Sequence, residues 1–272
     1  MKPRPFDYAR PDSVDEAVAL LAEYGDESRV LAGGQSLIAM LNLRLVDPGL
    51  LIDIARMPEL DQIRDLGDTI EVGAAVTQNK LLAWPALAAK LPLLAVALPN
   101  VGHFQTRNKG TVCGSIAHAD PSSEIPLSLA TLDGEVVLQS KRGTRVLPAA
   151  EFQVDMLSTA CEPDELIVAV RFPVVRTRGA AFREVSRRHG DFAIIAVAAM
   201  MDGTASVRLG VGGMAGKPQV RRVPADGVKA AVEQLADELE GYEDLHASAA
   251  MRRDMLRRLA PAVIAEAQAC AA

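Results

Sequence analysis

The chain has 272 residues, a hydrophobic fraction of 49% and a formal net charge of −6, with a pI near 5.3. This much apolar sequence suffices for a substantial core in one large or two smaller domains. The basic residues are scattered through an acidic chain, which excludes the basic patch typical of nucleic-acid-binding proteins, so we expect no nucleic-acid partner.

No apolar stretch reaches the roughly 20 residues needed to cross a bilayer, and the start of the chain leads into a polar segment. We therefore predict no membrane span and a cytoplasmic location. Cys113, Cys161 and Cys270 are far apart, which fits neither a disulfide framework nor clustered thiolate ligands. The four histidines have no metal-ligand spacing, so we expect no metal in this chain.

The first half of the chain alternates predicted strands and helices. Ser13 and Glu16 are placed to form a capping box at the start of a helix that Gly25 can end, and Ser36 is placed to cap a second helix. The expected elements are helices at 13–24 and 36–45, a helical segment at 81–98 interrupted by Pro85 and Pro92, an apolar run at 125–132, and strands at 29–32, 50–54, 69–74 and 135–139.

The second half begins with short β-rich runs, as in an antiparallel sheet, and ends in helical sequence. The runs cover 166–172, 181–186, 192–201 and 205–211, and helical spacing follows at 228–239 and 246–269. A basic, glycine-containing link at 176–179 predicts a domain boundary.

Two glycine-containing segments are candidates for binding a ligand. The first, at 31–37, has the sequence LAGGQSL, and its glycines expose backbone N–H groups just before a predicted helix. Such N–H groups favour an anion such as a pyrophosphate. Gly33 and Gly34 permit close approach of a ligand, while Gln35 and Ser36 add side-chain donors. An ordinary strand-to-helix turn is the alternative interpretation.

The second segment, at 108–124, combines glycines with hydroxyl, amide and carboxylate side chains in an otherwise apolar neighbourhood. It contains a second glycine turn that we expect to resemble the first in layout. Its carboxylates could accept hydrogen bonds from a ribose or an adenine-side group. Together the two segments could clamp a long, anionic, aromatic cofactor from both sides.

The pair of motifs AGGQS at 32–36 and TVCGS at 111–115 resembles the two flavin-binding signatures of the carbon monoxide dehydrogenase medium subunit and the xanthine dehydrogenase FAD domain. The similarity continues through 119–124, 182–188, 190–193 and 210–214. The chain is thus identified as a member of the FAD-binding medium subunits of the molybdenum hydroxylase family.

The resemblance implies an α+β fold with a two-part FAD-binding domain of the vanillyl-alcohol-oxidase (PCMH) type. A smaller C-terminal α/β domain, with an antiparallel sheet and helices, would follow it. We expect the FAD-binding domain at 1–176, with subdomains at about 1–55 and 56–176, and the C-terminal domain at 177–272.

The resemblance also implies where FAD binds. The first signature would cradle the diphosphate, and the second would continue along the diphosphate, the ribityl chain and the flavin edge. Glu124 matches a carboxylate that contacts the adenosine part, and Ile167 and Arg183 match positions that line the flavin. The expected cofactor-binding residues are Ala32, Gly33, Gly34, Gln35, Ser36, Leu37, Gly110, Thr111, Cys113, Gly114, Ser115, Ala117, His118, Asp120, Glu124, Ile167 and Arg183.

Some of these residues have a simpler structural interpretation. Burial in a strand would explain Ile167, and a surface salt bridge would explain Arg183. Many relatives have two glycines where this chain has Cys113 and Gly114, so Cys113 would be strained if the position required positive φ. A small buried thiol is the alternative for it. 

Two further positions were assigned from local sequence. Asp120 could bind the cofactor, cap the following helix, or do both. Phe192 could pack near the flavin, but a place in the core of a strand fits its apolar context better.

The resemblance implies that the chain works with a large molybdenum-cofactor subunit and a small subunit carrying two [2Fe-2S] clusters, usually as a dimer of heterotrimers. Electrons would pass from molybdenum through the clusters to FAD here and then to an external acceptor, so we expect no catalytic residue in this oxidoreductase subunit. The alternatives are a self-sufficient FAD-dependent reductase of the same fold and a scaffold that has lost FAD. A nicotinamide-binding Rossmann protein is disfavoured because the first turn lacks G-x-G-x-x-G spacing.

Overall fold

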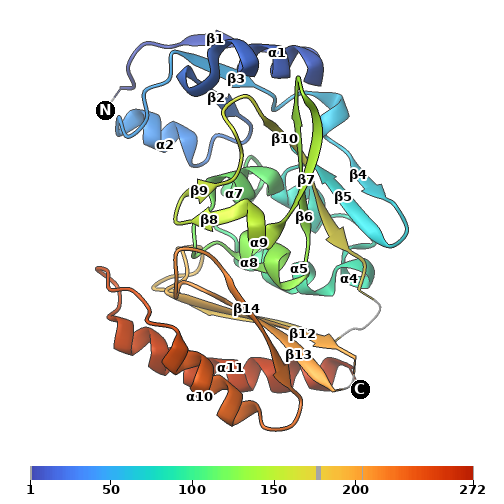
Figure 1. Ribbon diagram of the computed structural model, residues 1–272, viewed down its shortest axis with the longest axis vertical. Coiled ribbons are helices and arrows are strands. Elements are labelled where there is room, and N and C mark those ends of the chain that lie inside the picture. Colours follow the sequence, from blue (N-terminus) through green and yellow to red (C-terminus); the bar gives the residue numbers. More distant parts are fainter. Residues whose placement is uncertain (1, 176–178, 204, 272) are drawn as a thin grey trace.

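The computed structural model describes residues 2–175, 179–203 and 205–271, so most of the link predicted at 176–179 lies outside the described residues. Three sheets follow one another along the long axis of the molecule, with the N-terminal sheet at one end and the C-terminal helices at the other (Figure 1). Within these residues, no helix is both long and apolar enough to cross a membrane. The mixture of helices and sheets confirms the α+β class.

The first sheet is small and parallel, with its strands in the order β1-β3-β2. Ser13 caps α1 as predicted, because its side chain accepts a hydrogen bond from the N–H of Glu16. The carboxylate of Glu16 accepts from the N–H of Asp12 instead of Ser13, so the reciprocal bond of the capping box is absent. The elements are β1 (Asp7–Ala9), α1 (Val14–Tyr24), η1 (Gly25–Glu27), β2 (Ser28–Leu31), α2 (Leu37–Asn42) and β3 (Leu50–Asp53).

The second sheet has five antiparallel strands in the order β4-β5-β10-β6-β7. Its middle strand, β10, lies before the predicted boundary, but we grouped its run with those at 181–186, 192–201 and 205–211 as in one antiparallel sheet, and this grouping was wrong. Strand periodicity identifies a strand but not its neighbours, which depend on pairing distant in sequence. The strands are β4 (Ile63–Asp65), β5 (Thr69–Gly73), β6 (Glu135–Ser140), β7 (Gly143–Pro148) and β10 (Leu166–Pro173), and a separate hairpin is formed by β8 (Gln153–Asp155) and β9 (Ser158–Thr159).

Short helices connect β5 to β6. Pro92 begins one of them instead of interrupting it, since the first helical residue needs no N–H partner. These helices are α3 (Gln78–Leu82), α4 (Leu87–Lys90), α5 (Pro92–Ala97), η3 (Leu98–Asn100), α6 (Phe104–Arg107), α7 (Val112–His118) and α8 (Glu124–Thr131). Two more lie outside this connection, since η2 (Pro58–Leu60) precedes β4 and α9 (Ala149–Phe152) follows β7.

The second glycine motif differs from the predicted turn. Its residues form α7, which Thr111 caps by accepting a hydrogen bond from the N–H of Gly114 at 3.0 Å. A helix, α6, precedes it where the first motif follows a strand. The two motifs therefore do not share a layout.

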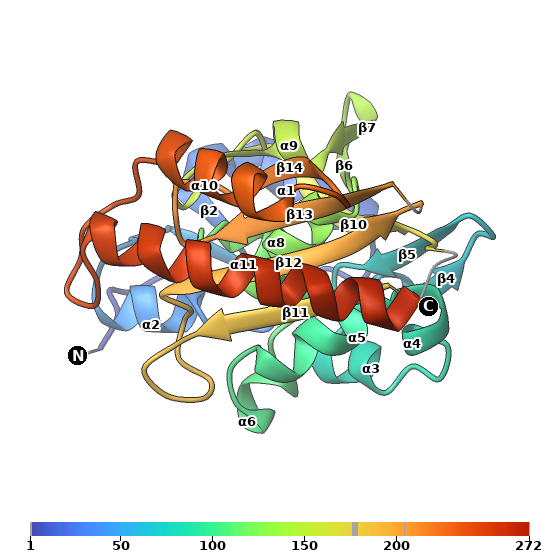
Figure 2. The same ribbon diagram turned by 90° about the horizontal axis from the view of Figure 1, so that it is seen from below.

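The third sheet is antiparallel, in the order β11-β12-β13-β14. One face packs on the central core, through residues such as Phe182 and Ala198, and the other packs on α10 and α11, through residues such as Ala181 and Val197. Figure 2 shows the two helices lying across this outer face. The elements are β11 (Ala180–Val185), β12 (Ile195–Asp202), β13 (Ser206–Gly212), β14 (Gln219–Pro224), α10 (Val228–Glu238) and α11 (Ala249–Ala271).

Candidate functional site

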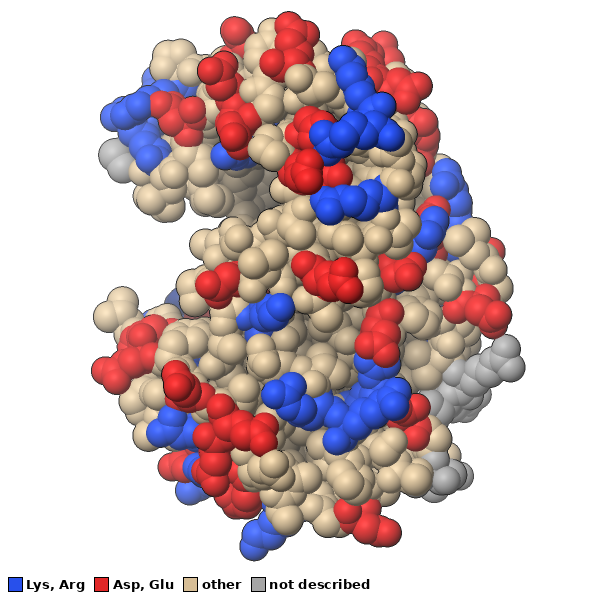
Figure 3. Space-filling model, viewed as in Figure 1, with Lys and Arg blue, Asp and Glu red and all other residues tan. Residues whose placement is uncertain are grey.

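A cavity of about 750 Å³ lies where the loop after β2 approaches α7. This volume is in the range of small-molecule and cofactor sites. The surface beside the N-terminal lobe is hollowed (Figure 3). All predicted cofactor-binding residues line the cavity except Asp120 and Arg183, namely Ala32, Gly33, Gly34, Gln35, Ser36, Leu37, Gly110, Thr111, Cys113, Gly114, Ser115, Ala117, His118, Glu124 and Ile167.

The two glycine motifs touch each other through their backbones. A Cβ atom at Gly33 would lie 2.2 Å from the carbonyl oxygen of Lys109 and 2.7 Å from the Cα atom of Gly110. Neither backbone atom can move aside as a flexible side chain can. A glycine at position 33 therefore allows the two loops to close into one wall.

The first loop offers backbone donors that no other part of the described chain uses. Gly34 has a φ of +68°, which favours glycine, and turns the chain toward α2. The N–H groups of Gly34, Gln35, Ser36 and Leu37 donate no hydrogen bond within the described residues. The Ser36 side chain makes no capping hydrogen bond to α2, contrary to our prediction, because its backbone is already helical. These donors suit an anionic group such as a diphosphate.

The conformation of the second motif explains why Cys113 is tolerated where many relatives have the first of two glycines. Cys113 is helical and has no positive φ, so the expected strain is absent. A Cβ atom at Gly114, in contrast, would lie 2.7 Å from Oγ1 of Thr111, the capping side chain of α7. Only the second position therefore requires glycine. Burial raises the pKa of the Cys113 thiol, so the thiol stays protonated at neutral pH.

Gln78 is a wall residue that the sequence analysis missed. Its side chain is buried, and Oε1 has no hydrogen-bond partner in the described structure, while Nε2 lies 3.5 Å from the carbonyl oxygen of Thr111. An unpaired buried polar atom beside a cavity fits a site built for a polar ligand. The bridge between Thr77 and Thr111 brings Gln78 here, and no local pattern announces such a long-range contact.

Ile167 and Glu124 also line this cavity. Ile167 belongs to β10 next to an irregularity in its pairing with β6, so burial in a strand and a place at the cavity both apply. Glu124 begins α8 and is 4% exposed. Burial, with a smaller contribution from Glu184 and Asp120, raises the pKa of Glu124 to about 8.

Arg183 lies away from the cavity. It forms an ion pair with Glu266 of α11 at 2.8 Å, so the simpler alternative describes it. Side chains alternate between the faces of a strand, and Arg183 shares the face of Ala181 toward α11. The next residue, Glu184, therefore faces the FAD-binding part.

Asp120 fixes a turn between this cavity and a neighbouring one. Its carboxylate accepts a hydrogen bond from the N–H of Ser122 at 2.8 Å. The N-cap of α8 is Ser123, so our alternative that Asp120 caps this helix was wrong. Asp120 lines the neighbouring cavity instead of the first.

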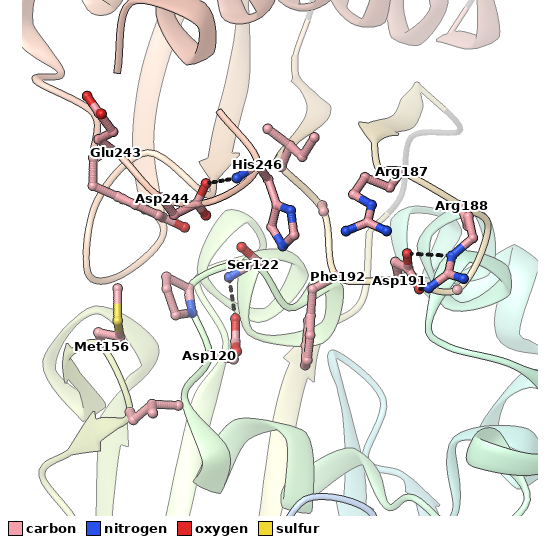
Figure 4. Close-up of a pocket in the computed structure, with 16 residues that line it drawn as sticks. Asp120, Ser122, Met156, Arg187, Arg188, Asp191, Phe192, Glu243, Asp244 and His246 are labelled. Carbon is pink, nitrogen blue, oxygen red and sulfur yellow. Dashed lines mark hydrogen bonds and ion pairs between the residues drawn. The ribbon is translucent and has the colours of Figure 1, made fainter. Parts of the chain in front are cut away.

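The neighbouring cavity has a volume of about 790 Å³ and shares Leu157, Gly190, Asp191 and Phe192 with the first. Phe192 is 57% exposed and precedes β12, so its predicted place in a strand core was wrong. Figure 4 shows the side chains of Arg187 and His246 in the middle of this space, while the ring of Phe192 points away from them. The far wall is formed by residues 242–244 and 246.

Arg252, a buried residue of α11, fixes the position of residues 242–244 in the far wall of this cavity. Arg252 is 1% exposed, and its guanidinium contacts the carboxylate of Asp244 at 2.6 Å and the ring of Tyr242 at 4.1 Å to the centroid. It also donates to the backbone carbonyls of Ile194 and Gly213. One side chain thus joins the segment after α10 to the third sheet.

Comparison with known proteins supports the same assignment. Residues 4–175 match the family described as FAD binding domain in molybdopterin dehydrogenase. The 6-hydroxypseudooxynicotine dehydrogenase complex subunit alpha of Paenarthrobacter nicotinovorans is 46% identical over 71% of this chain and 66% of its own length, so the match spans just under two thirds of that relative. The nicotine 6-hydroxylase medium subunit of the same organism is 36% identical over 96% of this chain and 97% of its own length.

A solved structure shows the same fold over the whole chain. Carbon monoxide dehydrogenase from Hydrogenophaga pseudoflava has a chain that is 34% identical, with a TM-score of 0.89 and complete coverage of both chains. This likeness confirms the resemblance noted from the two motifs and the PCMH-type fold that it implied. The chain belongs to the family of FAD-binding domains of molybdopterin dehydrogenases, and over its whole length it is similar to a medium subunit of a hydroxylase and to a chain of carbon monoxide dehydrogenase.

Proposed function

We propose that this chain is the electron-transfer subunit of a molybdenum hydroxylase. Electrons would come from two [2Fe-2S] clusters of a small partner subunit, which a large molybdenum-cofactor subunit reduces, and they would leave through FAD to an external acceptor. The observation that carries the proposal is the backbone contact between the two glycine motifs, which forms one wall of a cofactor-sized cavity that adjoins a second cavity.

The residues of the first cavity fit FAD. The free N–H groups of residues 34–37 would hold the diphosphate, and the polar wall with Gln78, Thr111 and Ser115 would hold hydroxyl or ring atoms. Bound FAD would supply the redox chemistry by accepting and releasing electrons. This chain would bind and orient the cofactor, and we assign it no catalytic residue.

The second cavity would admit the external acceptor. It adjoins the FAD cavity at Phe192 and Leu157, so a molecule within it would lie next to the cofactor. Arg187 and His246 supply cationic or donor groups, and Met156 and Tyr242 supply apolar surface, which suits a polar aromatic acceptor. 

Assembly as a dimer of heterotrimers, with the large and small subunits, belongs to the same proposal. The relatives described above are named as subunits of complexes, which supports partners for this chain as well. We also propose the domains at 1–176, with subdomains at about 1–55 and 56–176, and at 177–272. In support, each sheet draws its strands from a separate part of the sequence, within 7–53, 63–173 and 180–224.

The test is affinity purification of the tagged chain from its native host, followed by an absorption spectrum and metal analysis. We expect flavin, iron and molybdenum together with one larger and one smaller partner. A yellow chain that always purifies alone and reduces a substrate by itself would instead support the self-sufficient reductase. A complex that contains iron and molybdenum but no flavin would indicate a scaffold without FAD.

A further inference from the structure

A buried and a half-buried carboxyl group, Glu124 and Glu184, interact electrostatically where α8 packs against the third sheet. Glu124 lines the FAD cavity and is almost fully buried. Glu184 lies on the inner face of β11, and its Oε2 atom is buried without a hydrogen-bond partner in the described structure. Burying a carboxylate without a partner is costly, so such groups normally become protonated.

The surroundings of Glu124 contain more negative than positive charge. The carboxyl groups of Asp120 and Glu184 act on it, and Arg107 is the cation that opposes them. The Arg107 guanidinium, however, donates to the carbonyl oxygens of Pro99, Val101 and Gly102 at 2.9 to 3.3 Å. Within the described residues it forms no ion pair with Glu124.

We propose that Glu124 binds FAD as an uncharged carboxylic acid that donates a hydrogen bond, and that Glu184 is a positioning residue that keeps the proton on Glu124. The inference rests on the proposed FAD site. FAD carries a negative diphosphate and many oxygen and nitrogen acceptors, so an uncharged acid can donate to it where a carboxylate would repel it. The neutral acid thus contributes affinity that the ionised acid does not.

The sign of the pH dependence follows from the pKa of Glu124, which burial raises to about 8. The proton is present below this pH and is lost above it, so FAD affinity should be constant near pH 6 to 7 and fall above pH 8. Linkage allows a tenfold loss for each pH unit above the pKa, so binding should be roughly tenfold weaker at pH 9 than at pH 7. Burial raises the pKa of Glu184 to about 7, so Glu184 is mostly charged above pH 8 and adds repulsion there.

The experiment is a titration of the flavin-free full chain with FAD, followed by flavin fluorescence from pH 6 to 9. Glu124→Gln places an uncharged donor at the same site, so we expect its affinity to lose the pH dependence. Glu184→Gln removes a repelling charge, so we expect the pKa of Glu124 to fall and the weakening to begin at lower pH. Glu266→Gln is the matched control, because it removes a carboxylate on the other side of β11 and should leave the profile unchanged. Circular dichroism checks that each variant is folded.

The outcomes separate this inference from the proposed function. Stoichiometric FAD binding with the same affinity from pH 6 to 9 would overturn the inference and leave the FAD site intact. If folded Glu184→Gln shows the same pH dependence of FAD affinity as the wild type, Glu184 has no part in keeping the proton on Glu124. A folded wild-type chain that binds no FAD at any pH would overturn both.

Discussion

Replacing Gly33 by alanine should separate the two loops that hold FAD. The added Cβ would lie 2.2 Å from the carbonyl oxygen of Lys109, and ordinary contact begins at 3.4 Å. The distance between the two loops must therefore increase by 3.4 − 2.2 = 1.2 Å. The atom in the way belongs to the backbone of Lys109, so it cannot move aside as a flexible side chain can. Overpacking of this kind costs about 1 to 3 kcal/mol.

This free energy can appear in either of two measurements. If the loops stay closed without FAD, Gly33→Ala lowers the free energy of unfolding of the flavin-free chain. If they open, the loss appears as weaker FAD binding, by roughly 5- to 150-fold at 1.4 kcal/mol for each factor of ten. Thermal unfolding of the flavin-free chain and fluorescence titration with FAD together recover the whole effect.

The matched control is Gly49→Ala, at a position without positive φ where the nearest atom to an added Cβ is 3.7 Å away. We expect this variant to unfold and bind FAD like the wild type. Wild-type stability and wild-type FAD affinity in Gly33→Ala would refute the claim that backbone contact between the loops shapes the site.

Three other predictions concern single residues. Gly34→Asp should abolish flavin retention in the folded chain, because it places a carboxylate beside the diphosphate and forces a positive φ on a side-chain-bearing residue; the FAD content of the purified variant measures this. Cys113 should resist alkylation at pH 8 in the native chain and react after denaturation, since burial raises its pKa; mass spectrometry of the labelled peptide decides. Arg252→Met should lower the free energy of unfolding by about 3 kcal/mol, measured by urea denaturation, because Asp244 and two carbonyls lose their partner, and Arg252→Lys should lose less.

The ligand-binding motifs and most elements could be predicted from the sequence alone. Helices such as α1 and α11 and strands such as β5 follow from the period of their apolar residues, which is a local property of the chain. The glycines at 33, 34 and 114 also stood out locally. The spacing and order of the motifs then sufficed to identify the family.

Local patterns could not determine how distant segments meet. They grouped β10 with the later strands instead of with β5 and β6, and they could not reveal that Gly33 touches Lys109 or that Gln78 reaches the cavity. β14 was missed because its side chains are largely exposed and polar, so it has no apolar period. Contacts of this kind depend on chain closure over many residues, which no short window contains.

For the candidate site residues, too, some properties follow from the sequence and others only from the tertiary structure. The sequence determined that loops rich in glycine and donors exist, because those properties belong to the residues themselves. Tertiary structure decided that Arg183 faces α11 while its neighbour Glu184 faces the core, since a strand sends adjacent side chains to opposite sides and only packing selects which side is which. It also decided the charge of Glu124, because the pKa of a carboxyl group depends on the water and the charges that the fold leaves around it.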